Sequence, residues 1–305
     1  MSVLGSRKHR LAVADNPVVG VFISTDQGTT WQHRGWTNYI RTFYAVEGAD
    51  GAFWSACGNG VLRSTDDGAT WKITTGWEIT EVLKVKVDPT LPATAYAASA
   101  YGVFRTTDAC EHWAMLPIPL TLPFASDLLI DASNRNHILV ATERGIFSST
   151  NGGGVWTARG LAGKGIRTIV QVPHLHGTFW AGTEDDGVFF SSDGGSTWTP
   201  RNSGLHHKTV YAIAFAPGVP TTIYLGTHGG GVYTSTDGGR SWREHGNGLQ
   251  DPDVHALVVL PSDPSIILAG TLNGGLYRST DAGTTWQFNS QEEAQVWGLS
   301  VNQRR

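Results

Sequence analysis

"GVYTSTDGGRSW", residues 231–242, is the stretch that decides the fold of this chain. A β-branched and aromatic run leads into Ser235, Asp237 and two glycines, and Trp242 closes the motif. The closing tryptophans recur every 40 residues (Trp31 to Trp71) to 44 residues (Trp242 to Trp286). Variants of the motif lie at 20–31, 60–71, 102–113, 145–156, 187–198 and 275–286. A period of this length over a whole chain indicates a repeat architecture, a solenoid or a propeller.

One repeat, residues 208–245, contains four short segments with the character of β-strands. They are "VYAIAFAP" at 210–217, "TTIYLGT" at 221–227, "GVYTST" at 231–236 and "SWREH" at 241–245. Glycine- or proline-containing turns separate them, and no segment shows a helical period. Four such strands form one antiparallel blade of a propeller.

The two ends of the chain complement each other. The start, at 10–24, matches a blade from its second strand onward, and the end, at 294–303, matches a first strand. We therefore predict an all-β, seven-bladed β-propeller of four-stranded antiparallel blades, whose ring is closed by the C-terminal strand completing the first blade. The predicted blades of this single domain (1–305) are 10–37 plus 294–303, 38–77, 78–120, 121–162, 163–205, 206–249 and 250–293.

Composition excludes several classes of function. The chain has 22 basic and 26 acidic residues with a net charge of −4, and no basic stripe points to a nucleic-acid partner. No signal peptide or membrane-spanning run is visible, so we expect a cytoplasmic protein, or an extracellular one if a leader has been removed. Cys57 and Cys110 should lie too far apart to bridge. Phosphate-loop, dinucleotide and serine-hydrolase motifs are absent, and we expect no cofactor.

The pattern Ser-x-Asp-x-Gly-x-Thr-Trp resembles the Asp-box, or BNR, repeat of the sialidase-like superfamily. Sialidases are six-bladed with fewer boxes. A chain with a box in every blade is therefore more similar to non-sialidase BNR propellers, such as photosystem II assembly-factor-like (Ycf48-type) proteins and xyloglucanase propeller modules. The resemblance implies a fold rather than a function. It also implies that each box is the turn between the third and fourth strands, on the rim away from the ligand face.

We interpret the boxes as structural turns. An aspartate can accept backbone hydrogen bonds within its own turn, and glycine adopts a positive φ. Calcium binding is the alternative, but only one carboxylate recurs in each turn and calcium requires several. The residues at the box position are Asp26, Asp66, Asp108, Asn151, Asp193, Asp237 and Asp281.

The repeats differ most near the start of the innermost strand, at the expected mouth of the central channel. Superposed by hand, this position holds Arg41, Leu83, Ser126, Arg167, Tyr211, His255 and Trp297. Loops at the same face add Arg144 and His228. Polar variety with aromatics around one mouth is typical of a binding surface, although solvated loop residues would look similar. We predict a non-catalytic binding or scaffold propeller whose protein or carbohydrate partner contacts Arg41, Arg144, Arg167, Tyr211, His228, His255 and Trp297.

The alternative is a glycoside hydrolase at the same face. Such an enzyme needs two carboxylates, and Asp185 or Asp186 can pair with Asp253 or Glu143. In a sialidase, Arg41, Arg144 and Arg167 would grip the substrate carboxylate with Tyr211 nearby. The Arg-Ile-Pro signature of that family is missing, however, because "YIRTFY" stands at 39–44. A weaker reading places a transition metal among neighbouring histidines, namely His206, His207, His228 and His255.

Overall fold

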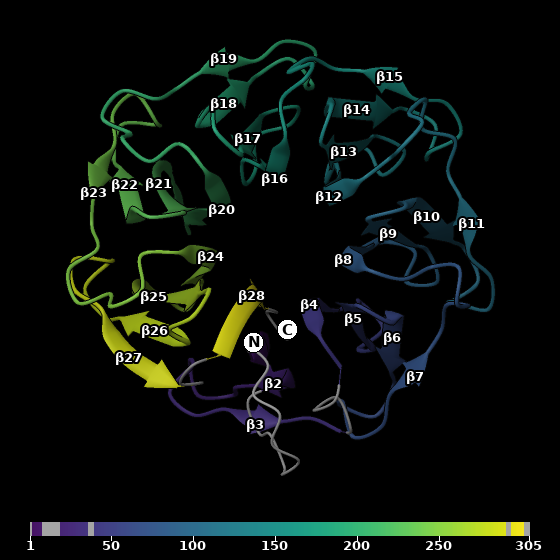
Figure 1. The fold of residues 1–305 in the computed structure, drawn as a ribbon, viewed down its shortest axis with the longest axis horizontal. Helices are drawn as coiled ribbons and strands as arrows, with labels where there is room; N and C mark the ends of the chain where they lie inside the picture. The colour runs from purple at the N-terminus through teal and green to yellow at the C-terminus, as the bar shows by residue number, and fades with distance from the viewer. Residues whose placement is uncertain (1, 8–18, 36–39, 291–293, 302–305) are drawn as a thin grey trace.

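The computed structural model describes residues 2–7, 19–35, 40–290 and 294–301. The described residues form strands and turns only, and they contain no helix that is long and apolar enough to cross a membrane. Four-stranded antiparallel sheets stand side by side around a common axis, as in a propeller (Figure 1).

Six blades in the described part of the chain are each made of four consecutive strands, and the first strand of each lies innermost (Figure 1). In chain order these strands are β4 Thr42–Glu47, β5 Phe53–Cys57, β6 Gly60–Ser64 and β7 Lys72–Ile73; β8 Val82–Val87, β9 Ala95–Ser99, β10 Gly102–Thr106 and β11 Ala114–Met115; β12 Ala125–Ile130, β13 Ile138–Thr142, β14 Gly145–Ser149 and β15 Thr157–Ala158; β16 Ile166–Gln171, β17 Phe179–Thr183, β18 Val188–Ser191 and β19 Thr199–Pro200; β20 Val210–Ala216, β21 Val219–Thr227, β22 Gly231–Ser235 and β23 Arg243–Glu244; β24 Val254–Leu260, β25 Asp263–Thr271, β26 Leu276–Ser279 and β27 Gln287–Ser290.

The predicted seven-bladed propeller is wrong, because only six blades of the described residues are made of consecutive strands. Besides the six consecutive-strand blades, the described residues form one composite sheet from the two chain ends, in the order β28-β1-β2-β3. Its strands are β28 Ala294–Ser300, β1 Ser2–Arg7, β2 Gly20–Ile23 and β3 Gln32–His33.

The composite sheet also differs from the predicted first blade in its second strand. The sequence placed this strand after residue 10, whereas β1 is Ser2–Arg7. The connection from β1 to β2 runs from Arg7 to Gly20, but the equivalent β5–β6 connection runs only from Cys57 to Gly60. Counting back from the box by the usual spacing therefore misplaced the strand. Residues 10–18 of the predicted blade lie outside the described residues.

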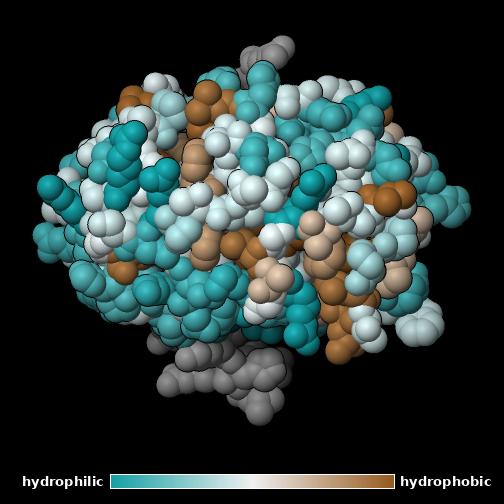
Figure 2. Space-filling view, turned by 90° about the horizontal axis from the view of Figure 1, so that it is seen from above, coloured by the Kyte–Doolittle hydropathy of each residue, from teal (hydrophilic) through white to brown (hydrophobic). Residues whose placement is uncertain are grey.

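Burial falls from the inside of each blade to its rim. The second strands β5, β9, β13 and β17 are buried at every residue, because both of their faces contact neighbouring blades. The fourth strands β7, β11, β15, β19 and β23 are two residues long and exposed. Figure 2 shows the ring from the side, where hydrophilic residues cover most of the surface and apolar residues lie among them. The core therefore lies between the blades.

The Asp-box residues hydrogen-bond within their own turns. Asp237 Oδ1 accepts from the Ser235 hydroxyl at 2.8 Å and from the Ser241 N–H at 2.9 Å, and Oδ2 accepts from the Ser241 hydroxyl at 2.6 Å. The hydrogen bonds from Ser241 lower the pKa of Asp237. In the other aspartate boxes, hydrogen bonds of the same kind lower the carboxyl pKa to about 2, at Asp26, Asp66, Asp108, Asp193 and Asp281. Asn151 accepts the same two Oδ1 bonds, from the Ser149 hydroxyl and the Val155 N–H.

The box tryptophans join each blade to the one before it. The Trp242 indole donates to the Arg201 carbonyl at 2.7 Å, and its ring meets that of Trp180 edge-on at 6.0 Å. The Trp286 indole donates to the His245 carbonyl at 2.9 Å. Trp242 and Trp286 thus pack between two blades and satisfy their own N–H groups there.

Candidate functional site

A β-bulge interrupts the innermost strand of each sheet near one end of the ring axis. In β8, Val82 pairs with Ser99 and Lys84 pairs with Ala98, so Leu83 has no partner in the ladder. An extra residue of this kind leaves the normal alternation and its side chain is redirected. The residues at the equivalent bulges are Phe43, Leu83, Ser126, Arg167, Tyr211, His255 and Trp297.

All of these bulge residues line one cavity of about 560 Å³, which we call the mouth cavity. The prediction that one variable position of each repeat gathers at the channel mouth therefore describes the geometry well, with one correction. In the blade of β4–β7 the equivalent residue is Phe43, not Arg41. Residues 40–42 read Ile-Arg-Thr, as do residues 166–168, and this local likeness shifted the alignment by two residues. Arg41 nevertheless lines the same cavity.

Aromatic rings form a continuous arc around one side of the mouth cavity, the aromatic arc. The Tyr211 and His255 rings stack at 4.1 Å between centroids with an interplanar angle of 22°. His255 meets Trp297 edge-on at 5.0 Å, and Trp297 meets Phe43 edge-on at 5.8 Å. Stacked and edge-on pairs are the favoured aromatic geometries, so the arc is preorganised.

Arg41 closes the arc with a positive charge. Its guanidinium carbon lies 5.5 Å from the Phe43 ring centroid and 5.6 Å from that of Trp297. Both distances fit cation–π contacts. No carboxylate of the described residues lies within ion-pair distance of Arg41. Its charge is therefore directed at whatever occupies the cavity.

His255 is neutral at physiological pH. Burial lowers its pKa to about 4, and Asp253 opposes this only in part. Its Nε2 atom is buried and has no hydrogen-bond partner. The arc thus holds a buried, unsatisfied nitrogen next to the Tyr211 and Trp297 rings.

Unlike Arg41, Arg167 is already paired with carboxylates of the protein. It forms ion pairs with Glu143, at 2.8 Å, and with Glu184. Burial opposes its charge, but these carboxylates outweigh burial and raise the pKa of Arg167. Glu143, one of the predicted catalytic acids, is therefore already partnered.

The other predicted acids do not meet in the cavity either. Asp186 pairs with Lys164 at 2.7 Å, and Asp253 pairs with His228 at 2.9 Å while accepting the Gly229 N–H. Asp185 is exposed. The carboxylates that do line the cavity are Glu81 and Asp127, which the sequence reasoning did not select.

The remaining predicted residues are spread along the rim of the same face. Arg144 is exposed in the β13–β14 turn and does not line the mouth cavity, whereas His228 does. His206 is exposed, and His207 Nδ1 lies 2.9 Å from the Tyr233 hydroxyl. Within the described ranges, no group of three or more His, Cys, Asp or Glu side chains is placed to hold a metal ion. The histidine cluster and the calcium reading of the boxes thus gain no support.

A second ring of side chains, which sequence reasoning missed, lies one residue beyond the bulges. Its polar half is Tyr44, Lys84, Asp127 and Thr168, and its other half is Ala212, Ala256 and Gly298. The available signal was charge inside apolar first strands, as in "VLKVKV" at 82–87. Burial opposes the Tyr44 phenolate, yet Lys86 and Lys84 outweigh burial and lower the pKa of Tyr44.

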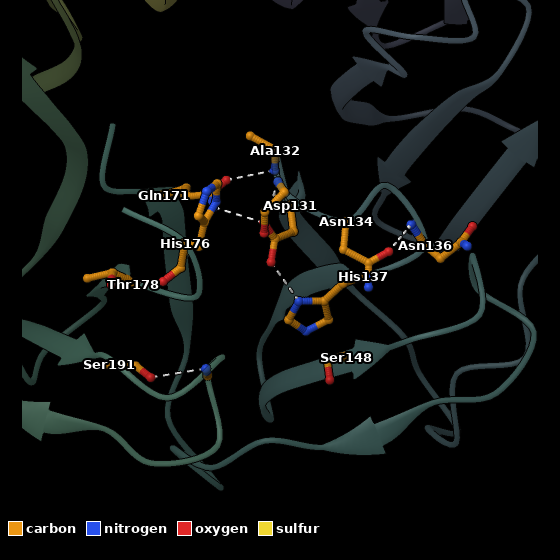
Figure 3. Close-up of polar contacts among 12 residues, drawn as sticks. Asp131, Ala132, Asn134, Asn136, His137, Ser148, Gln171, His176, Thr178 and Ser191 are labelled. Atoms are coloured by element: carbon orange, nitrogen blue, oxygen red, sulfur yellow. Dashed lines mark hydrogen bonds and ion pairs between the residues drawn. The ribbon is translucent and has the colours of Figure 1, made fainter. Parts of the chain in front are cut away.

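A separate polar cluster lies at the opposite end of the innermost strands (Figure 3). Asp131, just after β12, accepts from His137 Nδ1 at 2.9 Å and from Gln171 Nε2 at 2.9 Å. Gln171 belongs to the next blade, and its Oε1 accepts the Ala132 N–H. Asp131 and His137 are both buried. This cluster ties two blades together.

Comparisons with known proteins agree with this architecture. The model of the BNR/Asp-box repeat matches residues 22–33, and that of "Sortilin-Vps10: Sortilin, neurotensin receptor 3" matches residues 186–300. The fold is a β-propeller, and the turn at residues 22–33 matches the BNR/Asp-box repeat. No curated protein matches the sequence. The matches do not establish the sialidase-like superfamily that the sequence suggested.

Solved structures resemble this propeller at low sequence identity. The Niastella koreensis GH74 enzyme is 16% identical with a TM-score of 0.74, over 89% of this chain and 51% of that one. The Xanthomonas campestris GH74 xyloglucanase is 18% identical with a TM-score of 0.67, over 81% of this chain and 45% of that one. YCF48 bound to D1 peptide is 19% identical with a TM-score of 0.62, over 81% of each chain. The propeller thus spans about half of the GH74 enzymes, and the likeness shows the fold alone.

Proposed function

We propose that this BNR-type propeller is a non-catalytic binding module that holds a protein or glycan partner at the mouth cavity. The aromatic arc is the observation that carries the proposal. Its rings are fixed by one another, so a partner that packs against them meets a surface whose side-chain freedom is already restricted. Aromatic residues and arginine are also the residues that contribute most at binding interfaces.

The positions and partners of the carboxylates favour binding over hydrolysis. The predicted acids lie outside it and are partnered or exposed. Of the two carboxylates that line it, Asp127 accepts the Thr168 hydroxyl and the Ile169 N–H and lies 3.6 Å from Lys84. A glycosidase needs one carboxylic acid to donate a proton and a second carboxylate to act as base or nucleophile. Asp127 is held as an acceptor by its neighbours, which does not suit the role of proton donor.

The solved structures support both kinds of partner. YCF48 is bound to a peptide, and the Xanthomonas campestris protein is a xyloglucanase. An aromatic arc suits either, because rings pack on apolar side chains and on the faces of sugars.

The proposal is tested by probing a glycan array and a peptide array with wild-type protein and with a Trp297→Ala variant. The control is Trp77→Ala, because Trp77 is 91% exposed and does not line the mouth cavity. We expect a defined set of glycans or peptides to bind wild type and the control, with binding at least about tenfold weaker for Trp297→Ala. Equal binding by all three proteins would place the partner elsewhere. Release of reducing sugar from xyloglucan would instead favour the hydrolase.

A further inference from the structure

A smaller cavity continues the mouth cavity into the channel. It has a volume of about 180 Å³ and shares part of its wall with the mouth cavity, including Tyr44, Lys84 and Asp127. We call it the channel cavity. Because the two volumes share these side chains, the channel cavity lies directly beside the mouth cavity.

The channel cavity has long polar side chains in one part of its wall and small residues in another. On one side stand Tyr44, Lys84, Lys86 and Asp127, and on the other side Ala212, Ala256 and Gly298. Small residues across from long polar ones leave space in front of the polar groups. A Cβ on Gly298 would come within 2.5 Å of the Phe43 carbonyl, so this wall accepts no larger residue.

Positive charge in the channel cavity exceeds negative charge. Lys84 lies 3.6 Å from Asp127, and Asp127 also accepts the Thr168 hydroxyl and the Ile169 N–H. The half-buried Lys86 has no carboxylate within ion-pair distance among the residues that the structure describes. In the channel cavity, the two ammonium groups of Lys84 and Lys86 therefore share the single carboxylate of Asp127.

The phenol of Tyr44 lies between the two lysines. The Lys84 Nζ atom is 4.0 Å from the Tyr44 ring centroid, and the Lys86 Nζ atom is 5.2 Å from it. An ammonium group away from bulk water is costly unless a negative charge or hydrogen bonds compensate it. The Tyr44 phenol is the group of the protein that lies close enough to both lysines to offset their charge, and they lower its pKa.

We propose that the channel cavity binds an oxyanion group of the ligand, a carboxylate or a phosphate, between Lys84, Lys86 and the Tyr44 hydroxyl. The inference deepens the proposed function, and rests on it, because the ligand body would lie on the aromatic arc above. Ammonium groups are point-charge partners for carboxylate and phosphate, and they need no fixed bidentate geometry. A cavity of this volume accommodates such a group together with water.

The site can be tested with the anions alone, by isothermal titration of wild-type protein with inorganic phosphate and with acetate. Lys86→Met removes the ammonium charge of Lys86 and keeps a side chain of nearly the same length. Lys164→Met is the matched control, because Lys164 pairs with Asp186 outside both cavities. We expect at least one anion to bind wild type and Lys164→Met equally, and binding at least about tenfold weaker in Lys86→Met, since a charged hydrogen bond is lost. Preference for acetate points to a carboxylate ligand, and preference for phosphate points to a phosphorylated one.

A second measurement needs no lysine variant. Phenolate absorbance of wild-type protein, with a Tyr44→Phe protein as the reference for the other tyrosines, reports the ionisation of Tyr44. A bound anion would offset the lysine charges, so saturating phosphate or acetate should shift Tyr44 ionisation to higher pH. No binding to wild type, equal binding to Lys86→Met, or binding without a shift at Tyr44 would overturn the proposal.

The outcomes separate this inference from the proposed function. Phe43→Ala should keep the affinity for bare phosphate or acetate, because Phe43 belongs to the aromatic arc and lines the mouth cavity but not the channel cavity. Loss of array binding in that variant with anion binding intact supports both proposals. Anion binding in a protein whose arrays show no dependence on Trp297 supports the channel site and contradicts the proposed function.

Discussion

The His255 ring stacks on the Tyr211 ring, 4.1 Å between centroids, and the two residues come from neighbouring blades. Each sits at the bulge of its innermost strand, Tyr211 in β20 and His255 in β24. The bulges redirect both side chains to the channel mouth, where the rings contact each other before any ligand arrives. The stack excludes water from the imidazole, which explains why its pKa falls.

Stability should depend on pH through His255. Its folded pKa of about 4 lies below the ordinary value of 6.5, because burial disfavours the charged ring. Between these values the unfolded chain binds more protons, so the free energy of unfolding should rise as pH increases from about 4 to 6.5. Urea titrations should show that His255→Phe reduces this rise, by at most about 3 kcal/mol. A variant of the exposed His206, His206→Phe, should keep the full rise, and identical curves for both variants would contradict the assignment.

Two neighbouring glycines in one Asp-box should respond differently to alanine. Both have positive φ, 73° at Gly238 and 76° at Gly239. A Cβ on Gly238 would be 4.0 Å from the nearest Thr221 atom, whereas a Cβ on Gly239 would be 2.1 Å from the Trp180 ring. Gly238→Ala should therefore cost only backbone strain, about 1–2 kcal/mol. Gly239→Ala adds overpacking of about 1–3 kcal/mol to that strain, so its melting temperature should be clearly lower. Equal melting temperatures would mean that Trp180 moves aside freely.

The fourth Asp-box, which carries Asn151, allows a test of how the boxes affect unfolding at low pH. Its Asn151 accepts the hydrogen bonds that aspartate accepts elsewhere, but an amide does not titrate. The box aspartates have folded pKa values near 2, as at Asp281, below the ordinary value of 3.8. Their contribution is present above pH 3.8 and is lost as pH falls through about 2. Asn151→Asp should make acid unfolding steeper by one such group, and Asp281→Asn should make it shallower, as measured by circular dichroism against pH. The reverse order would show that the boxes do not hold their charged forms.

The repeat made the propeller, its antiparallel blades and the turn chemistry predictable, because each is written several times in the sequence. The gathering of Tyr211, His255 and Trp297 at one mouth followed from comparing repeats. The assignment of Arg41 failed because residues 40–42 have the same sequence, Ile-Arg-Thr, as residues 166–168, although Phe43 is the residue at the bulge. The position of β1 failed because one connection is longer than its equivalents.

Contacts between blades could not be read from the repeat either. Arg167 was expected to face a ligand, but it pairs with Glu143 and Glu184, which lie at different distances along the chain. The sequence analysis did not select Lys84 and Lys86 of β8, because only the closed ring places them beside Tyr44. Such pairings depend on how far one blade is rotated against the next, which no local pattern encodes.

The packing between neighbouring blades should weaken when a box tryptophan is removed. Trp242 is 3% exposed, contacts Trp180 and donates to the Arg201 carbonyl at 2.7 Å. Trp242→Ala should lower the free energy of unfolding by about 3–5 kcal/mol through the cavity it creates. Trp242→Phe keeps a ring but leaves the Arg201 carbonyl unpaired, and should cost about 1–3 kcal/mol. Trp77→Ala, at a side chain that is 91% exposed, should stay within about 0.5 kcal/mol of wild type. Chemical denaturation of the four proteins checks this order, and a Trp242→Ala protein as stable as Trp77→Ala would show that the blades do not depend on this contact.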